Sequence, residues 1–169
     1  MDASKILNDI IRREGGFVFH PADRGGATNY GITQQTLAEF RGHPVTVNDV
    51  RALSEDEARS IYLQRYIQEP GFDQIADAPL LGLVVDCAVN HGPDRAARWL
   101  QEAAGVAVDG VVGPVTLAAV NGGDGKALYR KVLARRCRFY GALIARDPRQ
   151  AAFAAGWAVR LSEFIEETP

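Results

Sequence analysis

Residues 79–93, PLLGLVVDCAVNHGP, contain the longest apolar run of the chain. Proline is favoured in the first turn of a helix and Gly92-Pro93 is a strong stop, so this stretch predicts a helix over residues 80–91. The helix has no clear polar face, and we therefore expect it in the centre of the fold. The run ends at Asp86 and is far shorter than the ~20 residues that span a bilayer, so no stable insertion into a membrane is expected.

Segments with helical period lie on both sides of this central helix, separated by Gly and Pro residues. On the N-terminal side, Thr33, Thr46 and Ser54 are suited to cap helices, and Ser54 with Glu57 has the pattern of a capping box. The other long helices are predicted over residues 3–14, 94–104, 114–120, 126–144 and 148–165. The sequence therefore predicts a mainly α fold.

Length and composition set further bounds. The chain has 169 residues, of which 47% are hydrophobic and 24% charged, and these are ordinary globular proportions. A chain of this length can hold a core without disulfides or a structural metal. Cys87 and Cys137 are accordingly predicted to be free, mostly buried thiols. His20, His43 and His91 do not have the spacing of metal ligands, and we expect neither a metal nor a cofactor.

Residues 31–42 superficially resemble a helix-turn-helix motif, which would suggest binding to DNA. The charge argues against this function. Residues 28–70 contain four Arg and six acidic residues, and the whole chain has a net charge of −2. We therefore predict no nucleic-acid partner.

Glu14 lies in an unusual position for a carboxylate. On the helix over residues 3–14 it falls near the middle of the apolar stripe formed by Leu7, Ile10 and Ile11. Burial raises the pKa of an unpaired carboxyl group, and a proton retained near neutral pH is what a general acid needs. The alternative is that Glu14 pairs with Arg12, Arg13 or Arg24, or that it frays at the end of the helix.

Residues 15–31 are rich in Gly, Asp and Asn and have no regular period, and a loop of this length inside a compact domain is usually functional. Gly15 and Gly16 permit a sharp reversal after Glu14. A short, irregular β-hairpin would then place Asp23 and the Thr28 hydroxyl opposite Glu14. A protonated carboxyl and a carboxylate are the pair of groups that hydrolyses glycosidic bonds. The alternative is a surface turn rich in Asx residues.

This region also carries a resemblance to a known family. The motifs EGGFV (residues 14–18), HPAD (20–23), GG (25–26) and TNYGIT (28–33) resemble the signature of the glycoside hydrolase 108 family. Its members are lysozyme-like N-acetylmuramidases found among phage endolysins and secretion-associated bacterial muramidases. The later motifs DCAVNHGP (86–93), RWLQ (98–101) and DGVVGPVTL (109–117) are similar to the predicted peptidoglycan-binding segment of the same family. With Phe153, Trp157 and Arg160, the resemblance covers nearly the whole chain.

The resemblance implies a lysozyme-like fold and a peptidoglycan hydrolase that cleaves the β-1,4 bond from N-acetylmuramic acid to N-acetylglucosamine. It implies that Glu14 is the catalytic acid and that Asp23 and Thr28 position the attacking water, which gives inversion. The interval from Asp23 to Thr28 is one residue shorter than in the best-known phage lysozymes. Residues 1–92 would form the catalytic part and residues 93–169 the peptidoglycan-binding part, packed as one structural unit.

Amide and aromatic side chains suit the hydroxyl and acetamido groups of a glycan. The candidates for contact with the sugar are Asn29, Tyr30, Tyr62, Tyr66 and Asn90. Tyr62 and Tyr66 lie one helical turn apart, and the alternative for both is a place in the core. We expect a monomer whose partner is the glycan strand of peptidoglycan.

The site of action can also be predicted. The first ten residues interrupt their apolar positions with charges and lack the continuous apolar region of a signal peptide. We therefore expect synthesis in the cytoplasm and action on the cell wall, in the periplasm, after release by a holin or an export system. A bacteriolytic phage endolysin and a muramidase of bacterial secretion both fit these features.

Two other functions stay open. A lytic transglycosylase shares the lysozyme-like fold and the catalytic glutamate but needs no second carboxylate, so Asp23 argues against it. A non-catalytic module that binds the cell wall is the other. Cys87 and His91 share a helix face and could form a nucleophilic pair, although a buried thiol beside a satisfied histidine is the simpler interpretation. Residues 120–160 contain nine Lys or Arg and two Asp, which fits either solvated helix faces or attraction to an anionic cell-wall polymer.

Overall fold

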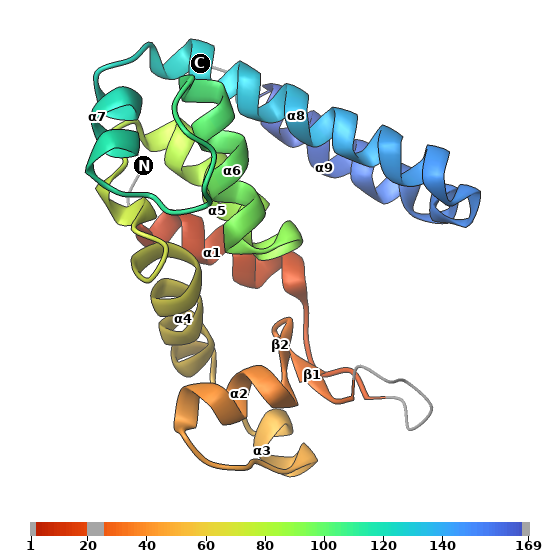
Figure 1. Cartoon of the computed structure of the whole chain (residues 1–169). Helices are drawn as coiled ribbons and strands as arrows, with labels where there is room; N and C mark the ends of the chain where they lie inside the picture. Colours follow the sequence, from red (N-terminus) through yellow and green to blue (C-terminus); the bar gives the residue numbers. More distant parts are fainter. Residues whose placement is uncertain (1–2, 20–25, 167–169) are drawn as a thin grey trace. The chain divides into compact units, whose positions relative to one another are not determined.

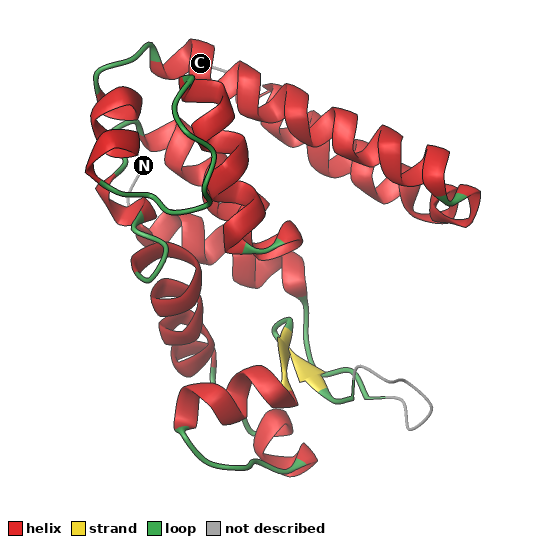
Figure 2. Ribbon diagram, viewed as in Figure 1, coloured by secondary structure: helices red, strands yellow, loops and turns green. Residues whose placement is uncertain are grey.

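The computed structural model describes residues 3–19 and 26–166 of the chain (Figure 1). Helices dominate this part, and the strands form a single small hairpin within it (Figure 2). The predicted mainly α, lysozyme-like fold with a short β-hairpin is confirmed. The chain divides into two compact units, Asp2–Gln68 and Glu69–Pro169. The functional division predicted at residue 92 stays a prediction.

The N-terminal unit is built on the packing of α1 against α4. Its elements are α1 (Ala3–Glu14), β1 (Thr28–Asn29), β2 (Ile32–Thr33), α2 (Gln34–Arg41), α3 (Val47–Arg51), α4 (Glu55–Leu63) and a π-helical turn, η1 (Gln64–Gln68). Leu7, Ile10 and Ile11 are all at least nine-tenths buried, so the apolar stripe predicted on the first helix is confirmed. Burial of this stripe stabilises the helix that carries Glu14.

The helix starts of this unit follow from its hydroxyl residues. Thr33 accepts a hydrogen bond from the amide of Thr36, and Thr46 forms a complete capping box with Asp49. Ser54 also caps its helix by accepting from the Glu57 amide. The other half of the capping box predicted at Ser54 is missing, because the Glu57 carboxylate pairs with the Arg41 guanidinium at 2.8 Å instead. A guanidinium is charged and can donate two hydrogen bonds to one carboxylate, so it competes well with a neutral backbone amide for that carboxylate.

The C-terminal unit surrounds α5, which packs against α6 and α8. Its elements are η2 (Phe72–Gln74), α5 (Ala78–His91), α6 (Pro93–Ala104), α7 (Pro114–Asn121), α8 (Gly125–Arg146), η3 (Pro148–Phe153) and α9 (Ala154–Glu166). Leu80, Leu83, Val84 and Val85 are fully buried, which confirms a central place for this helix within its unit. The helix predicted over residues 148–165 differs at its start, where η3 is a 3-10 helix.

A buried cluster of charged side chains connects three helices of this unit. Asp86 of α5 lies 2.7 Å from the guanidinium of Arg136 on α8 and 2.7 Å from that of Arg160 on α9. The side chains of Asp86 and Arg136 are 3% and 0% exposed. Charges are costly to bury unless they are paired, so this cluster fixes how the three helices meet.

The two cysteines have different environments. Cys87 is fully buried, and burial raises the pKa of its thiol to about 12. A thiol held neutral in this way is a poor nucleophile, which argues against the Cys87–His91 pair. Cys137 is a free, exposed cysteine, so the prediction that both thiols are mostly buried is wrong for this residue. Its neighbour Arg136 points inward, and the next position on a helix is turned by about 100°.

Residues 3–19 and 26–166 contain neither a candidate metal-binding group nor a candidate membrane-spanning helix. No group of His, Cys, Asp and Glu residues there is arranged to hold a metal ion. Nor does that part of the chain contain a helix with the length and apolar character needed to cross a membrane.

Candidate active site

Glu14 is the last residue of α1, and its side chain is half-buried. Gly15 follows it with a φ of 74°, a left-handed conformation that ends helices and that glycine adopts without strain. The carboxyl group therefore lies at the C-terminal end of α1, a helix whose apolar face is buried. This is the reversal that the sequence predicts after Glu14.

The chain returns in the predicted β-hairpin. Val18 and Thr28 exchange two backbone hydrogen bonds of 2.8 and 2.9 Å, and β1 pairs with β2 so that Thr28 lies opposite Thr33. Tyr30 and Gly31 form the two-residue turn, with φ values of 50° and 73°. Positive φ at both positions is typical of a type I′ turn, whose twist matches that of the strands.

The tip of this hairpin lies against Glu14. A Cβ atom added at Gly31 would stand 2.8 Å from Oε2 of Glu14 and 2.7 Å from the hydroxyl of Tyr62. Only glycine combines the required φ with such a close approach. Tyr62 is 2% exposed, and its hydroxyl donates to the carbonyl oxygen of Tyr30 at 2.8 Å. Tyr62 thus holds the turn in place beside the Glu14 carboxyl group.

Tyr66 lies on the same side of the unit. Its ring centroid is 5.4 Å from that of Tyr62, and it belongs to the π-helical turn η1. Such turns are rare and often occur at functional sites. Burial raises the pKa of Tyr66, and the negative charges of Glu14 and Glu39 raise it further against the opposing effect of Arg65. Tyr66 is therefore within electrostatic reach of Glu14.

The remaining predicted residues have different surroundings. Asn29 is buried, and its amide donates to the carbonyl oxygens of Val50 at 3.1 Å and Arg51 at 3.3 Å, which fixes α3 to the hairpin. Its contact with sugar stays a prediction. The Thr28 side chain is half-buried, and Asp23 lies outside the described residues. Asn90 belongs to the other unit, where it donates to the carbonyl oxygen of Asp86 at 2.8 Å.

The structure thus brings Glu14, Tyr30, Gly31, Tyr62 and Tyr66 together. The sequence pattern does not indicate the role of Gly31 as the residue that touches the carboxyl group, although a Gly between two short β-prone segments indicates a tight turn. A half-buried carboxyl group beside a tyrosine hydroxyl and a fixed backbone turn is suited to hold and deliver a proton.

The chain is similar to known families and to solved structures. Residues 7–92 match the family described as Glycosyl hydrolase 108, and residues 95–162 match the one described as Predicted Peptidoglycan domain. The chain is also similar to the structure titled "Structure of Brucella abortus SagA", with a TM-score of 0.81 and 34% sequence identity. That similarity covers 98% of this chain and 92% of the other. Among curated proteins, no match is found.

Proposed function

Because the chain belongs to the glycosyl hydrolase 108 family and carries a predicted peptidoglycan domain, it is a glycoside hydrolase that acts on peptidoglycan, and we propose that it is an N-acetylmuramidase. The bond it cleaves is the β-1,4 bond between N-acetylmuramic acid and N-acetylglucosamine. The proposal rests on one observation: the Glu14 carboxyl group lies at the C-terminal end of α1, directly next to the hairpin turn at Gly31. A general acid needs such a fixed carboxyl group at the scissile bond.

In the proposed mechanism, Glu14 donates its proton to the glycosidic oxygen as the bond to the anomeric carbon breaks. Asp23 accepts a proton from a water molecule that attacks this carbon from the opposite face, and the Thr28 hydroxyl helps to position that water. A single displacement of this kind inverts the anomeric configuration. The strand pairing of Thr28 with Val18 and Thr33 supports its role, because it fixes the backbone at this position.

The three tyrosines near Glu14 would have different roles, either in contacting the glycan or in holding the hairpin turn. Tyr66 is half-buried beside Glu14 and would offer its ring to the sugar, whereas the hydroxyl of Tyr62 is already used to hold the turn. Tyr30 is half-buried at the tip of the hairpin and would contact the glycan there. The enzyme would act on the cell wall, in the periplasm, as a phage-type endolysin or as a muramidase that serves secretion.

Mass spectrometry of the soluble products from purified peptidoglycan tests the proposal. Wild-type protein should release fragments with reducing N-acetylmuramic acid ends. Glu14→Gln should fold normally and lose about a hundredfold or more of this activity, because the catalytic proton is gone. The exposed variant Glu55→Gln is the matched control and should keep wild-type activity. NMR of the first products gives the anomer and so tests inversion.

The same experiment separates the other two functions. Anhydro-muramic acid ends would identify a lytic transglycosylase, which should also tolerate Asp23→Asn, whereas a hydrolase should lose most of its activity in that variant. Binding to peptidoglycan without any product would identify a non-catalytic wall-binding module. Substantial activity of Glu14→Gln would overturn the assignment of the acid.

A further inference from the structure

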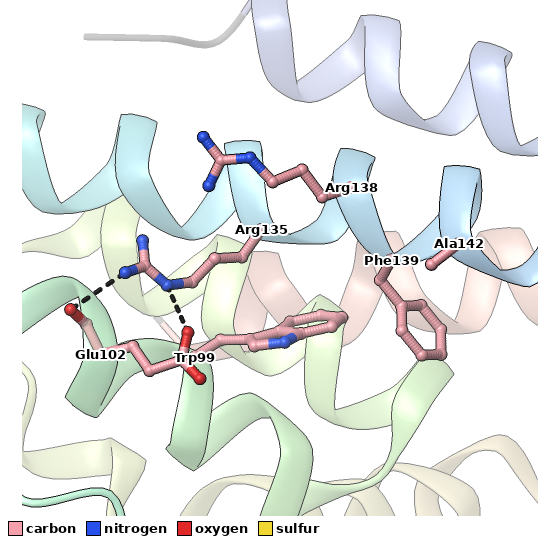
Figure 3. A pocket seen from close by; sticks show the side chains of 6 residues that line it. All are labelled: Trp99, Glu102, Arg135, Arg138, Phe139 and Ala142. Atoms are coloured by element: carbon pink, nitrogen blue, oxygen red, sulfur yellow. Dashed lines mark hydrogen bonds and ion pairs between the residues drawn. The ribbon is translucent and has the colours of Figure 1, made fainter.

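A second candidate site lies in the C-terminal unit, between α6 and α8. A pocket of about 350 Å³ is lined there by Trp99, Glu102, Arg135, Arg138, Phe139 and Ala142 (Figure 3). The four residues from α8 have the spacing i, i+3, i+4 and i+7, so they share one face of that helix. The pocket is therefore a product of helix packing and does not depend on a loop.

The apolar wall of the pocket is a fixed aromatic cluster. The rings of Trp99 and Phe139 meet edge to face, with centroids 5.5 Å apart. His91 of α5 packs edge-on against both rings at 5.2 Å. The guanidinium of Arg95 lies 4.5 Å from the centroid of Phe139. These contacts fix the orientation of the aromatic wall before any ligand binds, which lowers the entropic cost of binding.

Two arginines line the pocket, and within the described residues Arg135 has hydrogen-bond partners whereas Arg138 has none. Arg135 donates to the Glu102 carboxylate at 2.7 Å, to the Glu102 carbonyl oxygen at 3.0 Å and to the Lys131 carbonyl oxygen at 3.1 Å. Figure 3 shows the Arg135 contacts with Glu102. Arg138 is exposed and has no hydrogen-bond or ion-pair partner among the described residues. The lining contains two guanidinium groups, Arg135 and Arg138, and one carboxylate, Glu102, so the pocket favours an anionic ligand.

The chemistry of peptidoglycan indicates which part of it fits. In an intact strand the lactyl carboxyl group of N-acetylmuramic acid is in amide linkage to the stem peptide, so the free carboxylates belong to the peptide. A guanidinium pairs with a carboxylate through two parallel hydrogen bonds. The alanine methyl groups of the stem suit an apolar wall of Trp99, Phe139 and Ala142. A neutral glycan would use the wall but not the charge.

We propose that this pocket binds the stem peptide of peptidoglycan, with Arg138 paired to a stem carboxylate and the aromatic wall against the neighbouring alkyl groups. The inference rests on peptidoglycan being the substrate, as proposed above. It also gives a role to part of the positive charge of residues 120–160. The pocket would hold the peptide that branches from the strand.

Titration with three defined probes tests this. The probes are a disaccharide–tetrapeptide monomer, the same disaccharide without peptide and with its lactyl carboxyl group capped as a methyl amide so that it is neutral, and the free tetrapeptide. The readout is the NMR signal of the Trp99 indole N–H in the full chain, assigned with a Trp157→Phe variant. The two probes that carry the peptide should shift this signal, and the peptide-free disaccharide should not.

Two charge variants on the same helix make the test specific. Arg138→Gln should weaken binding of the free tetrapeptide about tenfold, the loss expected for one charge-assisted pair. Arg130→Gln removes an equal charge from another exposed position of α8, outside the pocket, and should change the affinity less than twofold. Equal losses in both variants would show general charge attraction and overturn the inference.

The remaining outcomes separate this inference from the proposed function. An equal shift of the Trp99 signal by the peptide-free disaccharide would identify a glycan site and overturn the assignment to the peptide, as would no shift by either peptide-bearing probe. Release of reducing ends from purified peptidoglycan is measured on the same sample. Release without peptide binding overturns only the inference, and peptide binding without release overturns only the proposed N-acetylmuramidase activity.

Discussion

Gly31 is the residue at which the backbone of the hairpin and the Glu14 carboxyl group constrain each other. Gly31→Ala would add a methyl group against Glu14 and Tyr62 and would strain a φ of 73°. We expect the free energy of unfolding to fall by about 1–2 kcal/mol from the left-handed conformation alone. We also expect a loss of about a hundredfold in activity, because displacement of the proposed acid, Glu14, by about 1 Å can have such an effect. Thermal unfolding and release of reducing ends measure the two effects.

Gly42→Ala is the control for this prediction. Gly42 has a φ of 72°, and a Cβ atom there would meet no atom within 4 Å. The control should therefore lose a similar amount of stability and keep its activity. Equal activity of the two variants would show that the contact between Gly31 and Glu14 is unimportant for catalysis.

His91 should make stability depend on pH. Burial, together with the positive charges of Arg136 and Arg95, lowers its pKa from 6.5 to about 4. Its Nε2 atom is also buried without a hydrogen-bond partner among the described residues. In the unfolded state the His91 imidazole binds a proton below pH 6.5, whereas in the folded state it binds this proton only near pH 4. This contribution to stability is thus complete above pH 6.5 and is lost as the pH falls toward 4, by about 1 kcal/mol per pH unit.

Urea unfolding at a series of pH values measures this slope. The His91→Phe variant keeps an aromatic ring in the cluster but has no group that titrates. The slope of the wild type between pH 6.5 and 4 should exceed that of the variant by the amount given above. Parallel curves would contradict the prediction.

The cluster of Asp86, Arg136 and Arg160 joins α5, α8 and α9. Asp86→Asn would leave the fully buried guanidinium of Arg136 without its counter-charge. Breaking a buried pair from one side costs about 3–5 kcal/mol, so we expect a large fall in the free energy of unfolding. Chemical denaturation followed by circular dichroism measures it.

Asp94→Asn provides the comparison within the same unit. Asp94 pairs with Arg98 at 3.0 Å on the surface of α6, and its side chain is 71% exposed. Exposed pairs of this kind contribute about 0.5 kcal/mol or less. A similar loss for both variants would show that the buried cluster does not determine how the three helices pack.

Most helices were predictable because their signals are local. Thr33, Thr46 and Ser54 act as caps, as the sequence predicts, since a cap depends only on residues three positions apart. α8 starts at Gly125, just before the predicted residue 126, because Asp124 is its cap, and it ends at Arg146, slightly beyond the predicted residue 144. The 3-10 helix η3 was not predictable from periodicity, since short 3-10 and α segments give similar patterns.

Contacts between residues that are far apart in the sequence could not be predicted. The position of Glu14 follows from the period of one helix. In contrast, the hydrogen bond from Tyr62 to Tyr30 joins residues 32 positions apart, and no local pattern indicates it. The pocket beside Trp99 likewise needs the packing of α6 on α8. The sequence therefore predicts the position of Glu14 on its helix and the hairpin, but not the contacts that hold them together.

The pair between Asp86 and Arg160 has a consequence for synthesis on the ribosome, because the two residues are 74 positions apart. Translation proceeds from the N-terminus at about 5–20 residues per second, and domains generally fold as they emerge. The unit Asp2–Gln68, with Glu14 and its hairpin, is complete in the nascent chain before Asp86 is made. The other unit must wait for its last helix to emerge before the charge of Asp86 is fully matched.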